Sequence, residues 1–344
     1  MHPARPQETS GPASARHWQA ELARGFREPA QLLAALGLTA ADCGLAPGAA
    51  PGFPLRVPRG FVARMRRGDP RDPLLLQVLP ARAEAVPEAG FVSDPVGDLA
   101  SARTPGLLQK YPRRALLVTT GACAVHCRYC FRREYPYGEH SAAAGKLETA
   151  IRDIAGDPSL EEIILSGGDP LVLAEQRLES LLKALDDLPH VRRIRLHTRV
   201  PVVLPERVDA RLLDFLGSLR TRIVVVIHAN HGREIDPPVA AALRALSAAT
   251  GPVLNQSVLL RGVNDSPGAI VELSHALFEA GVMPYYLHQM DPVSGAAHFA
   301  VADAEALRLI SAAMKALPGY LVPKLVRETP GALTKTLLGP FGAT

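Results

Sequence analysis

Three of the four cysteines in the chain lie within one short segment, at Cys123, Cys127 and Cys130. Their C-x3-C-x2-C spacing directly follows residues 115–119, an apolar and β-branched run that we expect to be a strand. Three thiolates on one short loop can bind three irons of a [4Fe–4S] cubane and leave the fourth iron without a protein ligand. The triplet therefore predicts an iron–sulfur cluster with one open coordination position.

An open iron of this kind can bind a small molecule that brings its own ligands. The amino and carboxylate groups of S-adenosylmethionine (SAM) suit that position, and an electron from the cluster would then break the C–S bond of the sulfonium. A structural zinc site is the alternative, with His126 or His140 as a fourth ligand. Such sites use four N or S ligands, commonly in C-x2-C pairs, so the spacing and the place after a strand favour the cluster.

The fourth cysteine, Cys43, stands alone and is interpreted as a structural bystander. One isolated thiol and one triplet do not make a disulfide framework, and metal-ligating cysteines are typical of a reducing compartment. The chain has no run of about eighteen apolar residues, and residues 1–16 are polar and proline-rich. We therefore expect a cytoplasmic protein without a membrane-spanning or export segment.

The elements that must position these cysteines alternate between strand-like and helix-like patterns from residue 114 onward. Repeated βα units predict a parallel sheet with right-handed crossovers, in which the loops after the strands share one edge. The predicted strands are 115–119, 162–165, 193–197, 223–228, 253–259, 284–288 and 320–326, and the predicted helices are 173–188, 211–219, 239–248, 269–280 and 302–317.

The first part of the chain has a different pattern, because helical segments at 18–24 and 29–36 are followed by loops punctuated by prolines. We expect an N-terminal helical and loop layer at 1–105 that packs on a barrel at 106–320, followed by a C-terminal segment at 321–344. The 38 Lys and Arg residues nearly balance the 34 Asp and Glu residues, so the total charge gives no indication of a nucleic-acid partner.

A series of further motifs, together with the cysteine loop, resembles the radical SAM superfamily and, within it, the lysine 2,3-aminomutase family. The resemblance implies an α/β fold with a partial (β/α)6 barrel, a [4Fe–4S] cluster on the three cysteines, SAM, and pyridoxal 5′-phosphate (PLP). The matching segments are 53–58 (FPLRVP), 110–114 (KYPRR), 165–171 (LSGGDPL), 196–201 (LHTRVP), 255–265 (NQSVLLRGVND) and 321–324 (LVPK).

The resemblance also implies which residues hold the two organic cofactors. It assigns the PLP-binding lysine to Lys335, which follows a Pro-Gly-containing loop, and the phosphate-holding role to Lys110, Tyr111 and Arg114. Cationic side chains and a phenol suit a phosphate dianion. The expected SAM site consists of Ser166, Gly167, Gly168, Asp169 and Gln256, where the glycines permit close approach of the backbone; His228 is a further candidate that is equally consistent with a core residue.

For the substrate, the resemblance implies that Arg132 binds the carboxylate of lysine, a role that suits a bidentate guanidinium. The alternative is that Arg132 balances the charge of the cluster. Asp291 and Glu328 match the two acidic residues that meet the far ammonium, although the second is usually Asp. The implied reaction is a 1,2-amino shift that converts L-α-lysine into β-lysine.

Several departures from the longer family members indicate one branch. Glu328, a final loop without a glycine run, and an end at Thr344 resemble the short enzymes that make (R)-β-lysine for attachment to translation elongation factor P. That branch implies lysine as substrate, an electron donor such as flavodoxin or ferredoxin, and a functional link to elongation factor P and its lysyl-ligase. Nucleic-acid and membrane partners are not expected, and self-association stays open.

Two alternatives remain at this point. An aminomutase for another amino acid, such as glutamate, would keep the cofactors but should lack the two carboxylates, so Asp291 and Glu328 speak against it. A non-catalytic zinc-containing module that acts on the translation apparatus belongs to a different class. The identity of the bound metal separates the second alternative from an enzyme.

Overall fold

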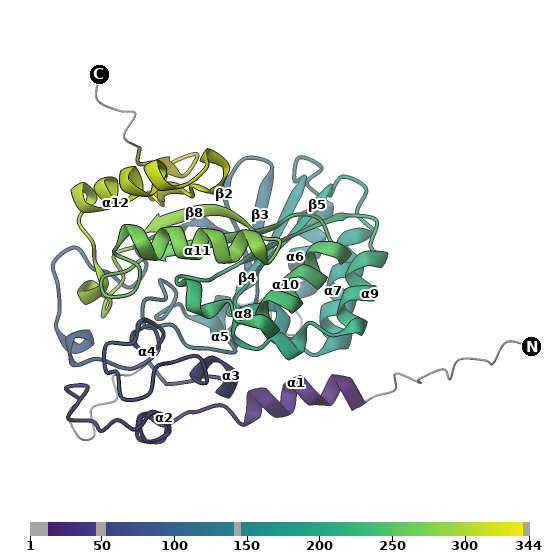
Figure 1. The fold of residues 1–344 in the computed structure, drawn as a ribbon. Helices are drawn as coiled ribbons and strands as arrows, with labels where there is room; N and C mark the ends of the chain where they lie inside the picture. Colours follow the sequence, from purple (N-terminus) through teal and green to yellow (C-terminus); the bar gives the residue numbers. More distant parts are fainter. Residues whose placement is uncertain (1–12, 46–52, 141–145, 340–344) are drawn as a thin grey trace, which may run out of the picture.

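The structure is a computed structural model that describes residues 13–45, 53–140 and 146–339 (Figure 1). Two expectations from the sequence fall at least partly outside the described residues. Most of the polar N-terminal stretch is not covered, and neither is the side chain of His140, which was considered as a zinc ligand. No helix in the described part of the chain is both long and apolar enough to cross a membrane.

A single ten-stranded sheet organises the fold, and its strands follow one another in chain order from β1 to β10. Strands β3 to β9 are parallel, whereas β1, β2 and β10 are antiparallel to their neighbours. The strands are β1 (Ala102–Thr104), β2 (Leu107–Tyr111), β3 (Arg114–Thr120), β4 (Glu162–Gly167), β5 (Arg193–Thr198), β6 (Arg222–Ile227), β7 (Val253–Leu259), β8 (Met283–Gln289), β9 (Lys324–Arg327) and β10 (Thr336–Leu337).

Each strand from β3 to β8 is followed by at least one helix, and these helices cover the outer face of the curved sheet (Figure 1). This is the partial (β/α)6 barrel that the sequence predicted, so the α/β fold class is confirmed. The helices are α5 (Tyr137–His140), α6 (Lys146–Ala155), α7 (Glu175–Asp186), α8 (Val200–Val203), α9 (Ala210–Ser218), α10 (Pro237–Ala249), α11 (Pro267–Glu279) and α12 (Asp303–Ala316), with short 3-10 turns between them.

The two faces of the barrel strands have different surroundings because successive side chains alternate in direction. On β5, Ile194 and Leu196 are fully buried in the core that the outer helices cover, while Arg195 and His197 occupy the opposite face. The same alternation on β8 buries Leu287 against α11 and α12. On β5, the polar side chains of Arg195 and His197 therefore face the inside of the barrel.

The N-terminal layer consists of α1 (Ala13–Ala23), α2 (Pro29–Leu36), α3 (Arg59–Val62) and α4 (Pro73–Leu76), which lie along one edge of the barrel (Figure 1). Trp18 and Phe61 are almost completely buried in the same hydrophobic core as the barrel strands. The buried carboxylate of Asp72 caps α4 and also pairs with Arg233 at 2.7 Å. The predicted helical layer is thus confirmed, while the division at 105 and 320 stays a prediction.

Helix α6 and the short helices α3, α4, α5 and α8 were not among the expected helices, and the expected and observed strands differ at the ends of the sheet. The expected strand at 320–326 begins later, at Lys324, because residues 319–321 form a 3-10 turn. Strands β1, β2 and β10 were not expected. They extend the parallel sheet at both ends and bring Lys110 and Lys335 next to strands of the barrel.

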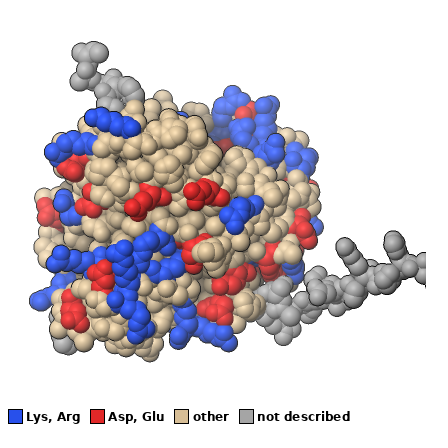
Figure 2. All heavy atoms as spheres, in the orientation of Figure 1, with Lys and Arg blue, Asp and Glu red and all other residues tan. Residues whose placement is uncertain are grey.

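The surface agrees with the balanced charge of the sequence. On the face seen in Figure 2, Lys and Arg side chains form several patches that have Asp and Glu side chains among them. Ion pairs near the surface of the described residues include Arg103 with Asp153 at 2.8 Å and Arg211 with Glu179 at 3.0 Å. Such pairs contribute little stability, about 0–1 kcal/mol each.

Candidate active site

The cysteine loop begins directly after β3 and brings its three thiols together. The backbone N–H of Cys130 donates to the carbonyl oxygen of Cys127 at 3.1 Å, which closes a turn between the two. Burial, followed by the nearby sulfur of Cys130, raises the pKa of the Cys123 thiol well above its usual range. Three adjacent thiols suit a cubane, which spreads its protein ligands over three irons. In the described part of the chain, no three His, Cys, Asp or Glu side chains converge as ligands of a single ion.

Backbone contacts with the N-terminal layer hold the cysteine loop. Arg56 donates from Nη1 to the carbonyl oxygen of Cys123 at 3.0 Å, and the N–H of His126 donates to the carbonyl oxygen of Arg56 at 2.9 Å. The Nδ1 atom of His126 lies 3.0 Å from the carbonyl oxygen of Pro54. His126, which was considered as a zinc ligand, therefore contacts this layer.

A buried ion cluster anchors the same loop from within. Arg128, between the second and third cysteines, donates from Nε to Glu84 at 2.8 Å, and Arg133 donates to the same carboxylate at 2.7 Å. The side chains of Arg128 and Glu84 have no exposed surface. Removing one partner of such a buried pair leaves an uncompensated charge and usually costs about 3–5 kcal/mol. The N-terminal layer thus supplies part of the support for the cysteines.

The glycine-containing loop after β4 packs directly on the cysteine loop. The N–H of Gly168 donates to the carbonyl oxygen of Thr120 at 2.6 Å, and the N–H of Asp169 donates to that of Ala122 at 2.8 Å. Gly167 has a φ of 117°, which only glycine adopts easily. A Cβ atom on Gly168 would lie 2.1 Å from the carbonyl oxygen of Ala122. These glycines are required because the two loops of the chain touch.

Replacing Gly168 with alanine will therefore disturb the cysteine loop. The added methyl group meets backbone, which cannot move away as a side chain would, and overpacking of this kind destabilises by about 1–3 kcal/mol. Gly268→Ala is the matched control, since Gly268 lies in α11 with open space around it. Denaturant unfolding should show a loss for Gly168→Ala alone. Equal stability of the two variants would contradict the close packing of the loops.

Asp169 links this loop to the end of the next strand. Its carboxylate accepts hydrogen bonds from Oγ1 of Thr198 at 2.8 Å and from the backbone N–H groups of Arg199 at 2.7 Å and Leu171 at 3.0 Å. Burial raises the pKa of this carboxyl to about 6. The carboxylate of Asp169, one of the expected SAM-binding residues, thus holds the loops after β4 and β5 together. The backbone of the loop after β4 is then the part of this segment that can approach a ligand.

A second polar cluster lies where β2, β9 and β10 meet. Glu328 accepts a hydrogen bond from Oη of Tyr111 at 2.6 Å and pairs with Nζ of Lys335. The guanidinium of Arg114 stacks over the ring of Tyr111 at 4.7 Å. The Nε atom of Arg114 is buried and has no hydrogen-bond partner in the described residues. The structure therefore brings together a lysine, a phenol and an incompletely satisfied cation, which are the groups expected to hold PLP.

Asp98 joins this cluster to the cysteine loop. It is almost completely buried and pairs with Nζ of Lys110 at 2.7 Å and with Nε of Arg132 at 2.6 Å. Arg132 also donates from Nη1 to Oγ of Ser166 at 3.1 Å, and Lys110 lies 4.0 Å from Glu328. A continuous chain of contacts thus runs from Arg132, two residues after the third cysteine, to the predicted PLP lysine, Lys335.

Of the remaining predicted residues, Asp291 lies near this cluster, together with His288 and His197. Burial raises the pKa of Asp291, which follows β8, to about 7, although the charge of Lys335 opposes the shift. Burial and then Lys335 lower the pKa of His288 to about 3. The Nε2 atoms of His288 and His197 are buried without a hydrogen-bond partner in the part of the chain described. Gln256 is half-buried on β7, three strands along the sheet from β4.

Sequence reasoning missed two residues that contact predicted site residues. Asp98 lies in an irregular segment before β1, where neither periodicity nor a motif signals a role. Arg199 belongs to the LHTRVP segment that resembles the family, but it was not assigned to the cluster, a cofactor or the substrate. In the structure, its Nη1 atom lies 2.7 Å from Sγ of Cys127. His228, considered as a SAM contact, has Nε2 at 2.9 Å from Oη of Tyr129.

Comparison with known proteins agrees with this geometry. Residues 117–273, from β3 to α11, match the family model of the radical SAM superfamily, which defines the class of the protein. L-lysine 2,3-aminomutase of Escherichia coli (strain K12) is 45% identical over 322 residues, which cover 93% of this chain and 94% of that protein. The chain belongs to the lysine 2,3-aminomutase family, whose members are isomerases.

Two further relatives carry the same name. The Haemophilus influenzae protein is 42% identical over 321 residues, which cover 93% of this chain and 95% of that protein. The Clostridium subterminale protein is 35% identical over 281 residues, which cover 81% of this chain and 67% of that longer protein. Radical SAM lysine 2,3-aminomutases use a [4Fe–4S] cluster, SAM and PLP.

Proposed function

We propose that this protein is a PLP-dependent L-lysine 2,3-aminomutase that converts L-α-lysine into (R)-β-lysine. The observation that carries the proposal is the chain of contacts from Arg132 through Asp98 and Lys110 to Glu328 and Lys335. It connects the thiol triplet to the predicted PLP lysine inside one barrel. A radical generated at the cysteine loop and a substrate held near Lys335 would therefore share one barrel.

When bound, the cluster would supply the electron that cleaves one C–S bond of SAM into a carbon-centred radical and methionine, and PLP would carry the nitrogen that shifts between neighbouring carbons. Cys123, Cys127 and Cys130 hold the cluster. SAM lies against the backbone of the loop after β4 and contacts Ser166, Gly167, Gly168, Asp169 and Gln256. Lys335 bonds PLP covalently, while Lys110, Tyr111 and Arg114 hold its phosphate.

Substrate binding follows from the charges around Glu328. This carboxylate already pairs with one lysine ammonium, that of Lys335, at a half-buried position. The ε-ammonium of a lysine substrate carries the same charge and would take the position beside Glu328 that the Lys335 ammonium occupies in this structure. Asp291 provides the second carboxylate, and an added cation would favour its charged form. Arg132 binds the substrate carboxylate in place of Asp98.

The proposal is tested by an anaerobic assay with isotopically labelled lysine, dithionite, SAM and PLP. We expect labelled β-lysine that depends on each component, with (R) configuration by chiral separation. Glutamate in place of lysine should give no product, because Glu328 and Asp291 would repel its side chain. A protein that binds one zinc and no iron after reconstitution, or that forms no β-lysine, would overturn the proposal.

Glu328→Gln gives a sharper test of the substrate site. A hydrogen bond to a charged group contributes about 1.5–3 kcal/mol, so kcat/KM for lysine should fall by about 10- to 100-fold. PLP content is measured in parallel to separate a substrate effect from a cofactor effect. Glu305→Gln, on the outer surface of α12, should leave kcat/KM unchanged. A normal kcat/KM in Glu328→Gln would remove this residue from the substrate site.

We further propose that the product serves elongation factor P in the cytoplasm, with flavodoxin or ferredoxin as electron donor and the lysyl-ligase of elongation factor P as the next enzyme. Two features support this branch: Glu at position 328, and similarity to the E. coli relative over nearly the whole of both chains. In a coupled reaction, labelled β-lysine should appear on elongation factor P. Its absence there, with β-lysine still formed, would assign the product another use.

A further inference from the structure

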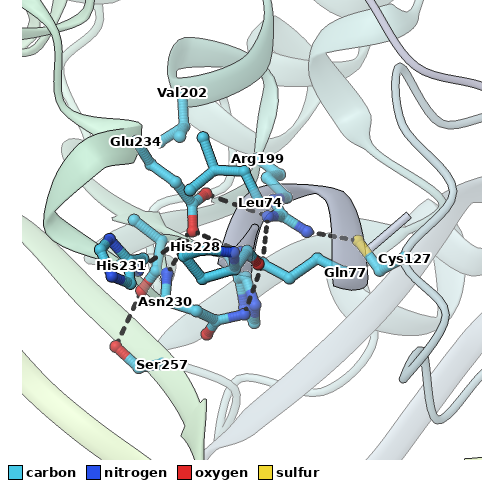
Figure 3. Close-up of polar contacts among 12 residues, drawn as sticks. Leu74, Gln77, Cys127, Arg199, Val202, His228, Asn230, His231, Glu234 and Ser257 are labelled. Carbon is cyan, nitrogen blue, oxygen red and sulfur yellow. Dashed lines mark hydrogen bonds and ion pairs between the residues drawn. The ribbon is translucent and has the colours of Figure 1, made fainter. Parts of the chain in front are cut away.

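Arg199, the first residue after β5, points its guanidinium at the cysteine loop (Figure 3). The Nη1 atom donates to Sγ of Cys127 and to Oη of Tyr129, both at 2.7 Å. The Nη2 atom donates to Oε1 of Gln77 at 2.7 Å and to Oε2 of Glu234 at 3.0 Å. Only 6% of the residue is exposed. A buried cation with four such partners has a fixed direction.

The partners of Arg199 are themselves held. Glu234 has no exposed surface and accepts hydrogen bonds from the backbone N–H groups of Asn230 at 2.9 Å and His231 at 3.1 Å. The side chain of Gln77 donates to the same carboxylate at 3.1 Å. The backbone N–H of Arg199 is fixed by Asp169. The guanidinium therefore cannot turn away from Cys127 without breaking several buried hydrogen bonds.

The guanidinium of Arg199 thus places a positive charge and an N–H donor beside Sγ of Cys127 at a buried position. When a [4Fe–4S] cluster accepts one electron, its net negative charge rises, and the charge spreads onto the ligand sulfurs. Hydrogen bonds to those sulfurs and nearby charges are among the factors that set the reduction potential of such clusters. A fixed cation beside one sulfur stabilises the reduced form more than the oxidised form.

We propose that Arg199 is a positioning residue that raises the reduction potential of the cluster through its contact with Cys127. The inference rests on the cluster assignment of the proposed function. One electron passes from an external low-potential donor to the cluster, and no bond of the protein changes. Arg199 makes that transfer easier by compensating the added charge, while Glu234 limits the effect by neutralising part of the guanidinium charge.

The test uses variants that keep the loop intact. Arg199→Lys retains the charge but loses the planar set of donors. The double variant Arg199→Gln with Glu234→Gln removes both charges together, so that no buried carboxylate is left without a partner. Arg207→Gln is the matched control, because Arg207 is a fully buried arginine that stacks on Trp18 at 4.8 Å and donates to the carbonyl oxygen of Leu171 at 2.9 Å, without a hydrogen bond to a cysteine in the described residues.

Each variant is reconstituted anaerobically, its iron content is measured, and the midpoint potential is obtained by redox titration followed by electron paramagnetic resonance without lysine. The double variant should retain about four irons. Its midpoint potential should be lower by ~59 mV, which for one electron corresponds to about a tenfold lower ratio of reduced to oxidised cluster at a fixed potential. The midpoint potential of Arg199→Lys should be lowered by a smaller amount. The control should match the unmodified protein.

Three results would overturn the inference. The first is an unchanged midpoint potential in the double variant with a full cluster. The second is a shift of equal size in Arg207→Gln. The third is loss of iron from both Arg199 variants while they remain folded, because Arg199 would then only support the loop. If the unmodified protein itself takes up no cluster, the proposed function fails, which is distinguishable from failure of this inference.

Discussion

Replacing Lys335 with alanine will prevent covalent attachment of PLP and reduce the rate of β-lysine formation by about a thousand-fold or more. The reason is that, in the proposed function, Lys335 supplies the amine that bonds PLP; its Nζ pairs with Glu328, which also accepts a hydrogen bond from Tyr111. The measurement combines the visible absorbance that PLP acquires when bonded to a protein lysine with product formation under anaerobic conditions. Iron content should stay unchanged.

Lys324 provides the matched control for this experiment. It lies on β9 near Glu328 in sequence, yet its side chain is exposed. Lys324→Ala should therefore keep both the PLP absorbance and the activity. If Lys335→Ala still bonds PLP and still turns over lysine, another lysine carries the cofactor and the assignment of Lys335 is wrong.

Replacing Cys127 with alanine will abolish the cluster. Three protein sulfurs are the minimum for a cubane whose fourth iron is open, so two sulfurs should not retain it. We expect iron content after reconstitution to fall close to zero, together with cleavage of SAM and formation of β-lysine. Cys43→Ala is the control, because Cys43 lies outside the triplet in the sequence and is a partly buried side chain that packs against the hydrophobic core.

The iron contents of Cys127→Ala and Cys43→Ala together test which residues ligate the cluster. Iron loss in Cys127→Ala with full iron in Cys43→Ala supports the triplet as the ligand set. A full, reducible cluster in Cys127→Ala would mean that another residue ligates the iron. The proposed reaction would then lose its basis, because the open iron that binds SAM would no longer be defined.

Much of the fold was predictable because the barrel strands bury one face against helices. That arrangement imposes a clear pattern on the sequence, and strands β3 to β8 were predicted to within two residues at each end. Strands β1 and β10 were missed, since they are short and their side chains are mostly exposed. Hydrophobic periodicity cannot identify a strand that packs little apolar surface.

The site was only partly predictable for a different reason. A sequence pattern reveals residues of reactive types at unusual spacing, such as the cysteine triplet, but not the counter-ions that hold them. Asp98 pairs with Arg132, and Glu234 pairs with Arg199. Each carboxylate is distant in sequence from its partner. The glycines at 167 and 168 were expected to admit SAM, whereas the structure shows that contact with the cysteine loop already requires them.

The sequential order of the ten strands also bears on how the protein is made. Each strand pairs with the one synthesised just before it, so the sheet can grow as the chain leaves the ribosome, and no early strand must wait for a distant partner. The cysteine loop is therefore enclosed early. Among the ten described strands, β10 pairs after the others, so the segment with the predicted PLP lysine, Lys335, joins the sheet later than the cysteine loop.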